Sequence, residues 1–172
     1  MLQPQAYQHK TKDISFVCSH KRMCPLHHWR FDLATQCKQQ HQADTFGTFD
    51  GGSYLPTLSE VLLPYRFNIC IENDISPYYF TERLTTALAC QTIPIYLGAS
   101  KIHEFFNMDG IIQISQQTDI EKVLKSCTPQ EYQRRLPAVL DNYQRVQNFL
   151  NTWDWVYEHY LAPDLNERGI NV

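Results

Sequence analysis

The chain has 172 residues, enough for one domain with a hydrophobic core, and its composition of 43% hydrophobic and 19% charged residues is typical of globular proteins. A formal net charge of −3 argues against a general nucleic-acid-binding surface. Because no apolar run reaches the roughly 18 residues of a membrane span and the polar N-terminus lacks a signal-peptide centre, we expect no membrane span and a location in the cytoplasm or at its membrane face in a bacterium.

The sequence predicts two segments in the chain and four structural elements in its first half. Residues 1–13 are expected to form a polar extension and residues 14–172 a single domain. The apolar run Ile14–Ser19 predicts a strand, and Leu26–Lys38 predicts a helix. Residues 43–54 predict a loop with a short strand at its start, in which Gly51–Gly52 form a turn. A short helix over Thr57–Leu63 is predicted with Thr57 as its cap and Pro64 at its end.

The second half alternates strands with helices. The predicted strands are Phe67–Ile71, Ile93–Gly98 and Ile111–Ser115. The predicted helices are Thr81–Gln91, Ser100–Phe106, Asp119–Ser126 and a long helix from Pro129 to about Leu161, interrupted near Pro137. Such an alternation over short connections predicts an α/β fold with a parallel sheet, whose ligands bind at the carboxyl ends of the strands.

The six cysteines are interpreted as reduced, mostly buried thiols, because the chain is not a short, cysteine-dense secreted domain. A zinc site is the alternative for one cluster of ligand-type residues. Its spacings differ from the paired motifs of common zinc modules, and we expect no metal. The cluster consists of Cys18, Cys24, His27, His28, Cys37 and His41.

Two polar residues end the central predicted strand. Glu72 and Asn73 directly follow the apolar run, at the edge of the sheet where ligands bind. A buried carboxylate needs a hydrogen-bond partner or solvent, and an asparagine offers both donors and an acceptor to a ligand.

The start of the next predicted helix carries a cation where a helix does not favour one. Thr81 begins the helix, whose free N–H groups and dipole attract anions such as phosphate. Arg83 lies in this first turn, which is consistent with an anion between it and the helix start. Tyr79 can donate from its hydroxyl, and the Glu82 carboxylate can accept from sugar hydroxyls. The alternative is a partly exposed ion pair between Glu72 and Arg83.

The stretch from Tyr65 to Asn107 resembles the donor-binding half of the α1,3-fucosyltransferases, glycosyltransferase family 10. The family pattern has a strand ending Phe-Glu-Asn, a tyrosine, Thr-Glu-Lys, a helix, and a strand of the type Ile-Pro-Ile/Val-Tyr-x-Gly. This chain has Ile71-Glu72-Asn73, Tyr79-Phe80-Thr81-Glu82-Arg83 and Ile93-Pro94-Ile95-Tyr96-Leu97-Gly98. The resemblance is looser over residues 14–65.

The resemblance implies a Rossmann-like domain, the C-terminal half of a GT-B glycosyltransferase, that binds GDP-fucose for inverting transfer to a glycan hydroxyl without a metal or other cofactor. It implies that Tyr79 and Arg83 contact the diphosphate and that Glu82 holds ribose or fucose hydroxyls. It also implies that Asn73 lies at the nucleotide and that Glu72 shapes the strand end.

Two departures concern the cations. Arg83 replaces the family lysine, which keeps the charge but changes its geometry. The family also has an arginine early in the first helix, where this chain has Leu26 or His27. Arg22, His27 and Arg30 are therefore the candidate phosphate contacts on this side of the site.

No residue matches the family's general base, and residues 1–13 leave no room for an acceptor domain before the first strand. We expect an N-terminal acceptor domain to be missing from this chain. The alternatives are a non-catalytic or truncated nucleotide-sugar-binding domain, or a glycosyltransferase that uses another nucleotide sugar. Aromatic residues in the last predicted helix favour packing over carbohydrate stacking; they are Trp153, Trp155, Tyr157 and Tyr160.

Overall fold

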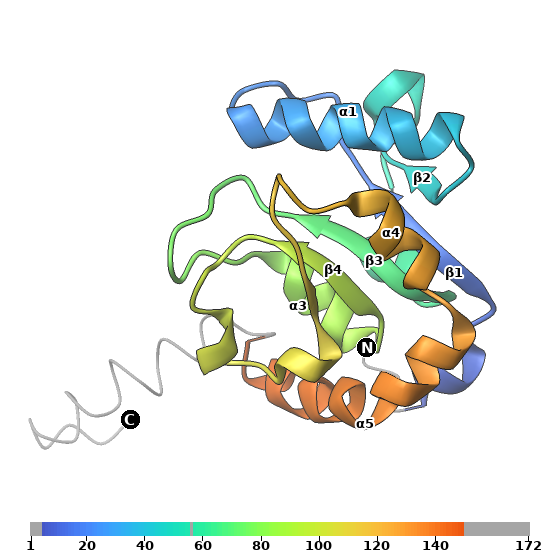
Figure 1. The fold of residues 1–172 in the computed structure, drawn as a ribbon, viewed down its shortest axis with the longest axis vertical. Helices are drawn as coiled ribbons and strands as arrows, with labels where there is room; N and C mark the ends of the chain where they lie inside the picture. Colours follow the sequence, from blue (N-terminus) through green and yellow to red (C-terminus); the bar gives the residue numbers. More distant parts are fainter. Residues whose placement is uncertain (1–4, 56, 150–172) are drawn as a thin grey trace, which may run out of the picture.

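A computed structural model describes residues 5–55 and 57–149 (Figure 1). Five parallel strands form one sheet in the order β2-β1-β3-β4-β5. The strands are β1 (Lys12–Val17), β2 (Asp44–Phe46), β3 (Tyr65–Ile71), β4 (Ile93–Leu97) and β5 (Ile112–Gln113). The prediction of a parallel α/β sheet of Rossmann-like type is confirmed.

Helices connect these strands, and short 3-10 turns lie among them. The α-helices are α1 (Pro25–Gln39), α2 (Leu58–Leu62), α3 (Glu82–Ala89), α4 (Ile120–Ser126) and α5 (Pro129–Val146). The 3-10 helices are η1 (Ala6–His9), η2 (Phe49–Gly51), η3 (Ile102–Glu104), η4 (Met108–Gly110) and η5 (Gln147–Phe149). Figure 1 shows α1 and α5 at opposite ends of the molecule.

The sheet is buried on both faces, which explains why β4 is a continuous apolar run and why β3 is apolar except at Arg66 and Asn68. Phe16, Ile69 and Ile95 face one cluster, to which α1 and α4 contribute. Cys70 and Tyr96 point to the opposite face and pack with α3. All six cysteines are free, and all except the half-buried Cys24 are buried, as predicted.

Several predicted boundaries needed correction. β1 starts two residues before Ile14, because Lys12 already pairs in register with Tyr65 of β3. The segment Ser100–Phe106 forms the 3-10 turn η3 instead of an α-helix, and β5 has two residues instead of five. The predicted cap is present, because Thr57 Oγ1 accepts from the Glu60 N–H at 3.3 Å.

The predicted interruption near Pro137 was wrong, because α5 continues through this residue. A proline in a helix removes one N–H and leaves the carbonyl four residues earlier without its partner. That carbonyl belongs to Gln133, and both Gln133 and Pro137 are exposed, so water can satisfy the free oxygen. The predicted continuation of this helix beyond residue 149 and its aromatic residues lie outside the described residues.

The N-terminal segment is anchored by a buried lysine. The Lys10 ammonium group donates hydrogen bonds to Leu63 O at 2.9 Å, Cys90 O at 2.7 Å and Thr92 Oγ1 at 2.8 Å. Leu63 and Cys90 are the C-caps of α2 and α3, so one cation satisfies carbonyls at the negative ends of two helices. This contact holds the start of β1 against the helices on one face of the sheet.

Candidate functional site

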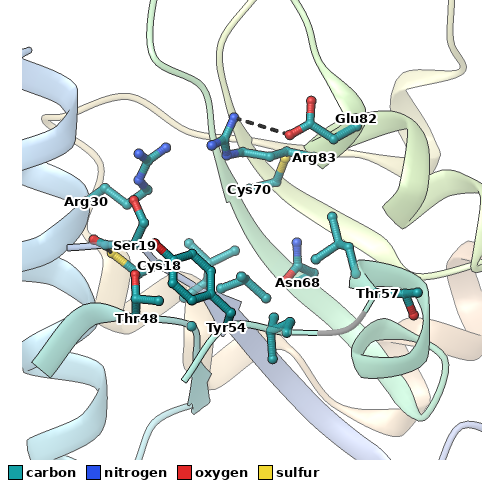
Figure 2. Close-up of a pocket in the computed structure, with 15 residues that line it drawn as sticks. Cys18, Ser19, Arg30, Thr48, Tyr54, Thr57, Asn68, Cys70, Glu82 and Arg83 are labelled. Carbon is teal, nitrogen blue, oxygen red and sulfur yellow. Dashed lines mark hydrogen bonds and ion pairs between the residues drawn. The ribbon is translucent and has the colours of Figure 1, made fainter. Parts of the chain in front are cut away.

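A cavity lies where the chain changes direction across the sheet. β1 is followed by β2 on one side and has β3 on the other, and in such sheets ligands bind in the crevice between the two strands. A cavity of about 300 Å³ opens there (Figure 2). Its lining comes from the end of β1, the middle of β3, the loop after β2, the segment that leads into α2, the second turn of α1 and the first turn of α3. The lining residues are Val17, Cys18, Ser19, Arg30, Gly47, Thr48, Tyr54, Leu55, Thr57, Leu58, Asn68, Ile69, Cys70, Glu82 and Arg83.

Arg30 reaches this cavity from α1 and is almost entirely buried, with 2% of its surface exposed. Its Nη1 donates to Ile71 O at 2.9 Å and to Asn73 Oδ1 at 3.2 Å. No carboxylate among the described residues forms an ion pair with it. Burial lowers the pKa of Arg30, and the positive charge of Arg83 lowers it further. A buried cation in this setting favours a bound anion.

Arg83 approaches the same cavity from the first turn of α3. Its Nη1 lies 3.8 Å from Glu72 Oε2 and 3.9 Å from Glu82 Oε1, and its side chain is 30% exposed. These distances are long for ion pairs, so the guanidinium retains donors for a ligand. Figure 2 shows the guanidinium groups of Arg30 and Arg83 converging from different elements. Glu82, which is exposed, lies at the rim beside Arg83.

Glu72 holds the start of α3 in place through hydrogen bonds to Thr81. The carboxylate is completely buried, and it accepts hydrogen bonds from the Thr81 N–H at 2.9 Å and from the Thr81 hydroxyl at 2.7 Å. Thr81 in turn is the N-cap of α3 and accepts from the Arg83 N–H. Burial raises the pKa of Glu72, while the two hydrogen bonds from Thr81 oppose this shift. The carboxylate therefore positions the helix start instead of lining the cavity.

Gly98 leaves the space that Glu72 occupies. A methyl group at this position would lie 2.6 Å from Glu72 Cγ and even closer to the Tyr96 hydroxyl. The Tyr96 hydroxyl accepts a hydrogen bond from the Ala99 N–H at 2.9 Å. The glycine that ends β4 is thus required by close packing at the end of β3.

His27 and Asn73 form a chain of hydrogen bonds that ends at Arg30 and is called the relay below. His27 Nδ1 accepts a hydrogen bond from the Met23 N–H at 3.0 Å, so a neutral ring carries its proton on Nε2. That Nε2 lies 2.9 Å from Asn73 Oδ1, the same atom that accepts from Arg30. Burial lowers the pKa of His27, and the cations Arg30, Arg83 and Lys21 lower it further. The relay fixes the side chain of Arg30 at the carboxyl end of β3.

The predicted site residues therefore fall into different places. Glu82, Arg83 and Arg30 line the cavity. Supporting positions behind it are taken by Glu72, Asn73, Thr81 and His27. The remaining two candidates lie away from the lining: Tyr79 is exposed on the loop before α3, and the Arg22 guanidinium lies 3.0 Å above the centre of the Phe31 ring.

Several lining residues were missed by the sequence analysis. Asn68 is one, although a polar residue inside the apolar run of β3 is a visible signal. Ser19, Thr48 and Tyr54 carry no such signal, because they come from loops whose path depends on the fold. Gly47 brings one loop close to β1: its φ is +97°, and any Cβ would collide with Cys18 O.

The cysteines and histidines of the zinc alternative do not meet. Within residues 5–55 and 57–149, no three side chains of the histidine, cysteine, aspartate or glutamate type are placed to hold a metal ion together. In the same part of the chain, no helix has both the length and the apolar character required to cross a membrane.

A protein-family model matches most of the chain. The model is that of the C-terminal part of glycosyltransferase family 10 (fucosyltransferase), and it matches residues 7–155. Among curated proteins, the α-(1,3)-fucosyltransferase FucT of Helicobacter pylori is 31% identical over 81 residues, which is 43% of this chain and 17% of the relative. The α-(1,4)-fucosyltransferase of Arabidopsis thaliana is 30% identical over 81 residues, 47% of this chain and 18% of the relative. The matches thus span less than a fifth of either relative's length.

Solved structures show the same fold. An α1,3-fucosyltransferase crystallised with GDP superposes with a TM-score of 0.62 at 21% identity, over 92% of this chain and 49% of that one. An α1,3-fucosyltransferase with GDP-fucose gives a TM-score of 0.59 at 19% identity, over 87% and 49% of the two chains. The Rossmann-like fold is therefore that of about half of these enzymes.

Proposed function

Because the chain belongs to glycosyltransferase family 10, the fucosyltransferases, we propose that it binds the nucleotide-sugar donor GDP-fucose for transfer of fucose to a glycan hydroxyl. Relatives of the same fold have been crystallised with GDP and with GDP-fucose, which supports this donor. We propose that the remaining part of the reaction, acceptor binding, uses a separate domain.

The observation that carries this proposal is the convergence of Arg30 and Arg83 on one cavity. Two cations that face the same space repel each other. Among the described residues Arg30 has no carboxylate partner, and the Arg83 guanidinium lies 3.8 Å from Glu72 and 3.9 Å from Glu82. A diphosphate between them would offset this repulsion and the cost of burying Arg30. The positive end of the α3 dipole lies at the same place and favours the same ligand.

In the proposed reaction, the acceptor hydroxyl displaces GDP from the anomeric carbon of fucose in a single inverting step. Negative charge develops on the leaving diphosphate, and Arg30, Arg83 and the start of α3 stabilise it. These groups supply the positive charge at the leaving group, so the proposal requires no metal. A general base must take the proton of the acceptor hydroxyl, and the proposal assigns it to the acceptor domain. Glu82, at the rim, accepts from ribose or fucose hydroxyls.

Titration calorimetry of the chain with GDP, GDP-fucose and UDP tests this proposal. We expect GDP and GDP-fucose to bind more tightly than UDP, and Glu82→Ala to weaken binding because a hydroxyl acceptor is lost. Equal affinity for GDP and UDP, or unchanged binding by Glu82→Ala, would show that the donor-site assignment is wrong.

A non-catalytic or truncated nucleotide-sugar-binding domain is the second candidate, favoured by the small share of the curated relatives that the chain spans. A fucose-transfer assay with N-acetyllactosamine distinguishes the two: transfer supports the enzyme, and donor binding or hydrolysis without transfer supports the binding domain. Binding of another nucleotide sugar in preference to GDP-fucose would point to a different transferase. The six free cysteines suit a reducing compartment, which for a bacterial protein supports a location in the cytoplasm or at the cytoplasmic membrane face.

A further inference from the structure

The side chain of Asn68 lines the cavity, and its amide Nδ2 is available as a hydrogen-bond donor. It lies in the middle of β3, opposite Ser15 of β1, and only 4% of its surface is exposed. The Ser15 hydroxyl, 3.1 Å away, donates to Asn68 Oδ1 and so orients the side-chain amide. No hydrogen bond joins Asn68 Nδ2 to any residue that the structure describes. Nδ2 is not a fully buried atom, so it is accessible from the cavity and can donate to a ligand acceptor there.

The surroundings of Asn68 suit a flat, mostly apolar group with a polar edge. Val17, Leu55, Leu58 and Ile69 line the same cavity. Tyr54 also lines it but is 82% exposed, and its ring packs against no described aromatic side chain. Figure 2 shows Tyr54 and Asn68 on the side of the cavity away from the two guanidinium groups. An exposed aromatic ring beside an apolar slot is an effective stacking surface for a heterocycle.

We infer that Asn68 reads the edge of the donor's base and selects a base that presents a carbonyl oxygen there over one that presents an amino group. This inference rests on the proposed function, because the two arginines must fix the diphosphate at the rim. The nucleoside then lies on the Tyr54 side, with its base above Asn68.

The chemistry of the bases gives this contact its selectivity. Guanine presents O6 and N7 as acceptors on one edge, whereas adenine presents an amino donor in place of O6. The Asn68 amide faces that edge as a donor, so an amino group there leaves two donors opposed. A site built to hydrogen-bond one group strongly rejects the analogue that lacks it.

A series of purine diphosphates tests the inference without any substitution. Calorimetry would compare GDP, inosine 5′-diphosphate and ADP on the unmodified chain. The inosine nucleotide keeps O6 but lacks the amino group of guanine, so we expect it to bind nearly as well as GDP. ADP should bind about tenfold to a hundredfold more weakly, the cost of an unsatisfied buried donor. Equal binding of ADP and GDP would overturn the inference.

Substitutions at Asn68 test the same contact from the protein side. Asn68→Asp keeps the shape but turns the donor into an acceptor, so the preference for GDP over ADP should shrink or reverse. Asn68→Leu should weaken GDP binding about tenfold or more. Binding of inorganic pyrophosphate should be unchanged in both variants, because it needs the arginines alone. Ser15→Ala, which frees the amide, should give a smaller loss for GDP, and thermal unfolding shows which variants fold.

The possible outcomes separate the inference from the proposed function. If the unmodified chain binds neither GDP nor pyrophosphate, the proposed function itself fails. If it binds GDP but the Asn68 variants leave the purine preference intact, Asn68 has a structural role with Ser15, and the inference is wrong. If Asn68→Leu weakens GDP-fucose but not GDP, the sugar occupies this part of the cavity, which also contradicts the inference. Should the Asn68 variants fail to fold, the nucleotide series decides.

Discussion

The buried carboxylate of Glu72 holds the N–H and the hydroxyl of Thr81, at 2.9 Å and 2.7 Å. These two hydrogen bonds join the end of β3 to the start of α3 across the loop that separates them. The helix start that carries Arg83 is therefore fixed by a group that itself lies outside the cavity. These hydrogen bonds explain why the carboxylate of Glu72 directly follows the buried strand β3.

Loss of the Thr81 hydroxyl should destabilise the fold. Thr81→Ala removes an N-cap, which costs about 0.5–2 kcal/mol. It also leaves one oxygen of the buried Glu72 without its donor, at about 1–3 kcal/mol. Denaturant unfolding should show a clear decrease for Thr81→Ala and a small one for Thr81→Ser, which keeps the hydroxyl. Equal stability of the two variants would contradict the role of this hydroxyl.

A methyl group at position 98 should displace Glu72. In Gly98→Ala the new Cβ would lie 2.6 Å from Glu72 Cγ, so one of the two must move. We expect a loss of about 1–3 kcal/mol in the free energy of unfolding, the usual cost of overpacking. GDP binding should weaken as well, because the α3 start that carries Arg83 shifts. A matched control is Gly51→Ala, in which the added methyl meets no atom within 4 Å. Only backbone strain at a φ of +76° affects the stability of this variant, and its GDP affinity should be unchanged.

The relay through His27 predicts a pH dependence. Because the pKa of His27 is lowered from 6.5 in the folded protein, the unfolded chain takes up its proton first as the pH falls. The stability that the neutral ring provides is therefore present above pH 6.5 and is lost progressively below it. Unfolding measured from pH 8 to pH 5 should show this loss in the unmodified chain. His27→Gln should be less sensitive to pH over this range, and an unchanged pH profile would contradict the prediction.

Lys10 predicts a second pH effect, at higher pH. Burial lowers its pKa from 10.5 to about 7, even though three oxygens accept from its ammonium group. Between these two values the unfolded chain binds the extra proton, so this residue makes the fold more stable as the pH rises. The stability difference between the unmodified chain and Lys10→Met should therefore increase from pH 7 to pH 10 in favour of the unmodified chain. A constant difference would show that Lys10 stays charged in the fold.

The fold was largely predictable because its local signals agree with its tertiary structure. The mostly apolar runs that form β3 and β4 are buried on both faces, and Thr57 caps α2 as predicted. The predicted interruption of the helix near Pro137 was wrong, because the cost of a proline inside a helix depends on whether the carbonyl that loses its partner is exposed. That exposure is a property of the packed structure.

The site was predictable only in part. Glu82 and Arg83 were expected at the ligand because they follow a motif in one continuous segment. The role of Arg30 was harder to assign, because whether Arg22, His27 or Arg30 reaches the cavity depends on the orientation of α1. Asn68 and Tyr54 come from different segments, and their meeting at one cavity appears only when β1, β3 and the loop before α2 are packed together.

The most direct test of the central claim is the binding of GDP and of guanosine to Arg30→Met, Arg83→Met and the double variant. Arg134→Met, at an exposed position on α5, is the matched control. We expect each single variant to lose GDP affinity about tenfold to a hundredfold, because each removes charge-assisted hydrogen bonds to the diphosphate. Guanosine binding, and GDP binding by the control, should stay unchanged. Undiminished GDP binding in the double variant would contradict the claim that these two arginines hold a diphosphate.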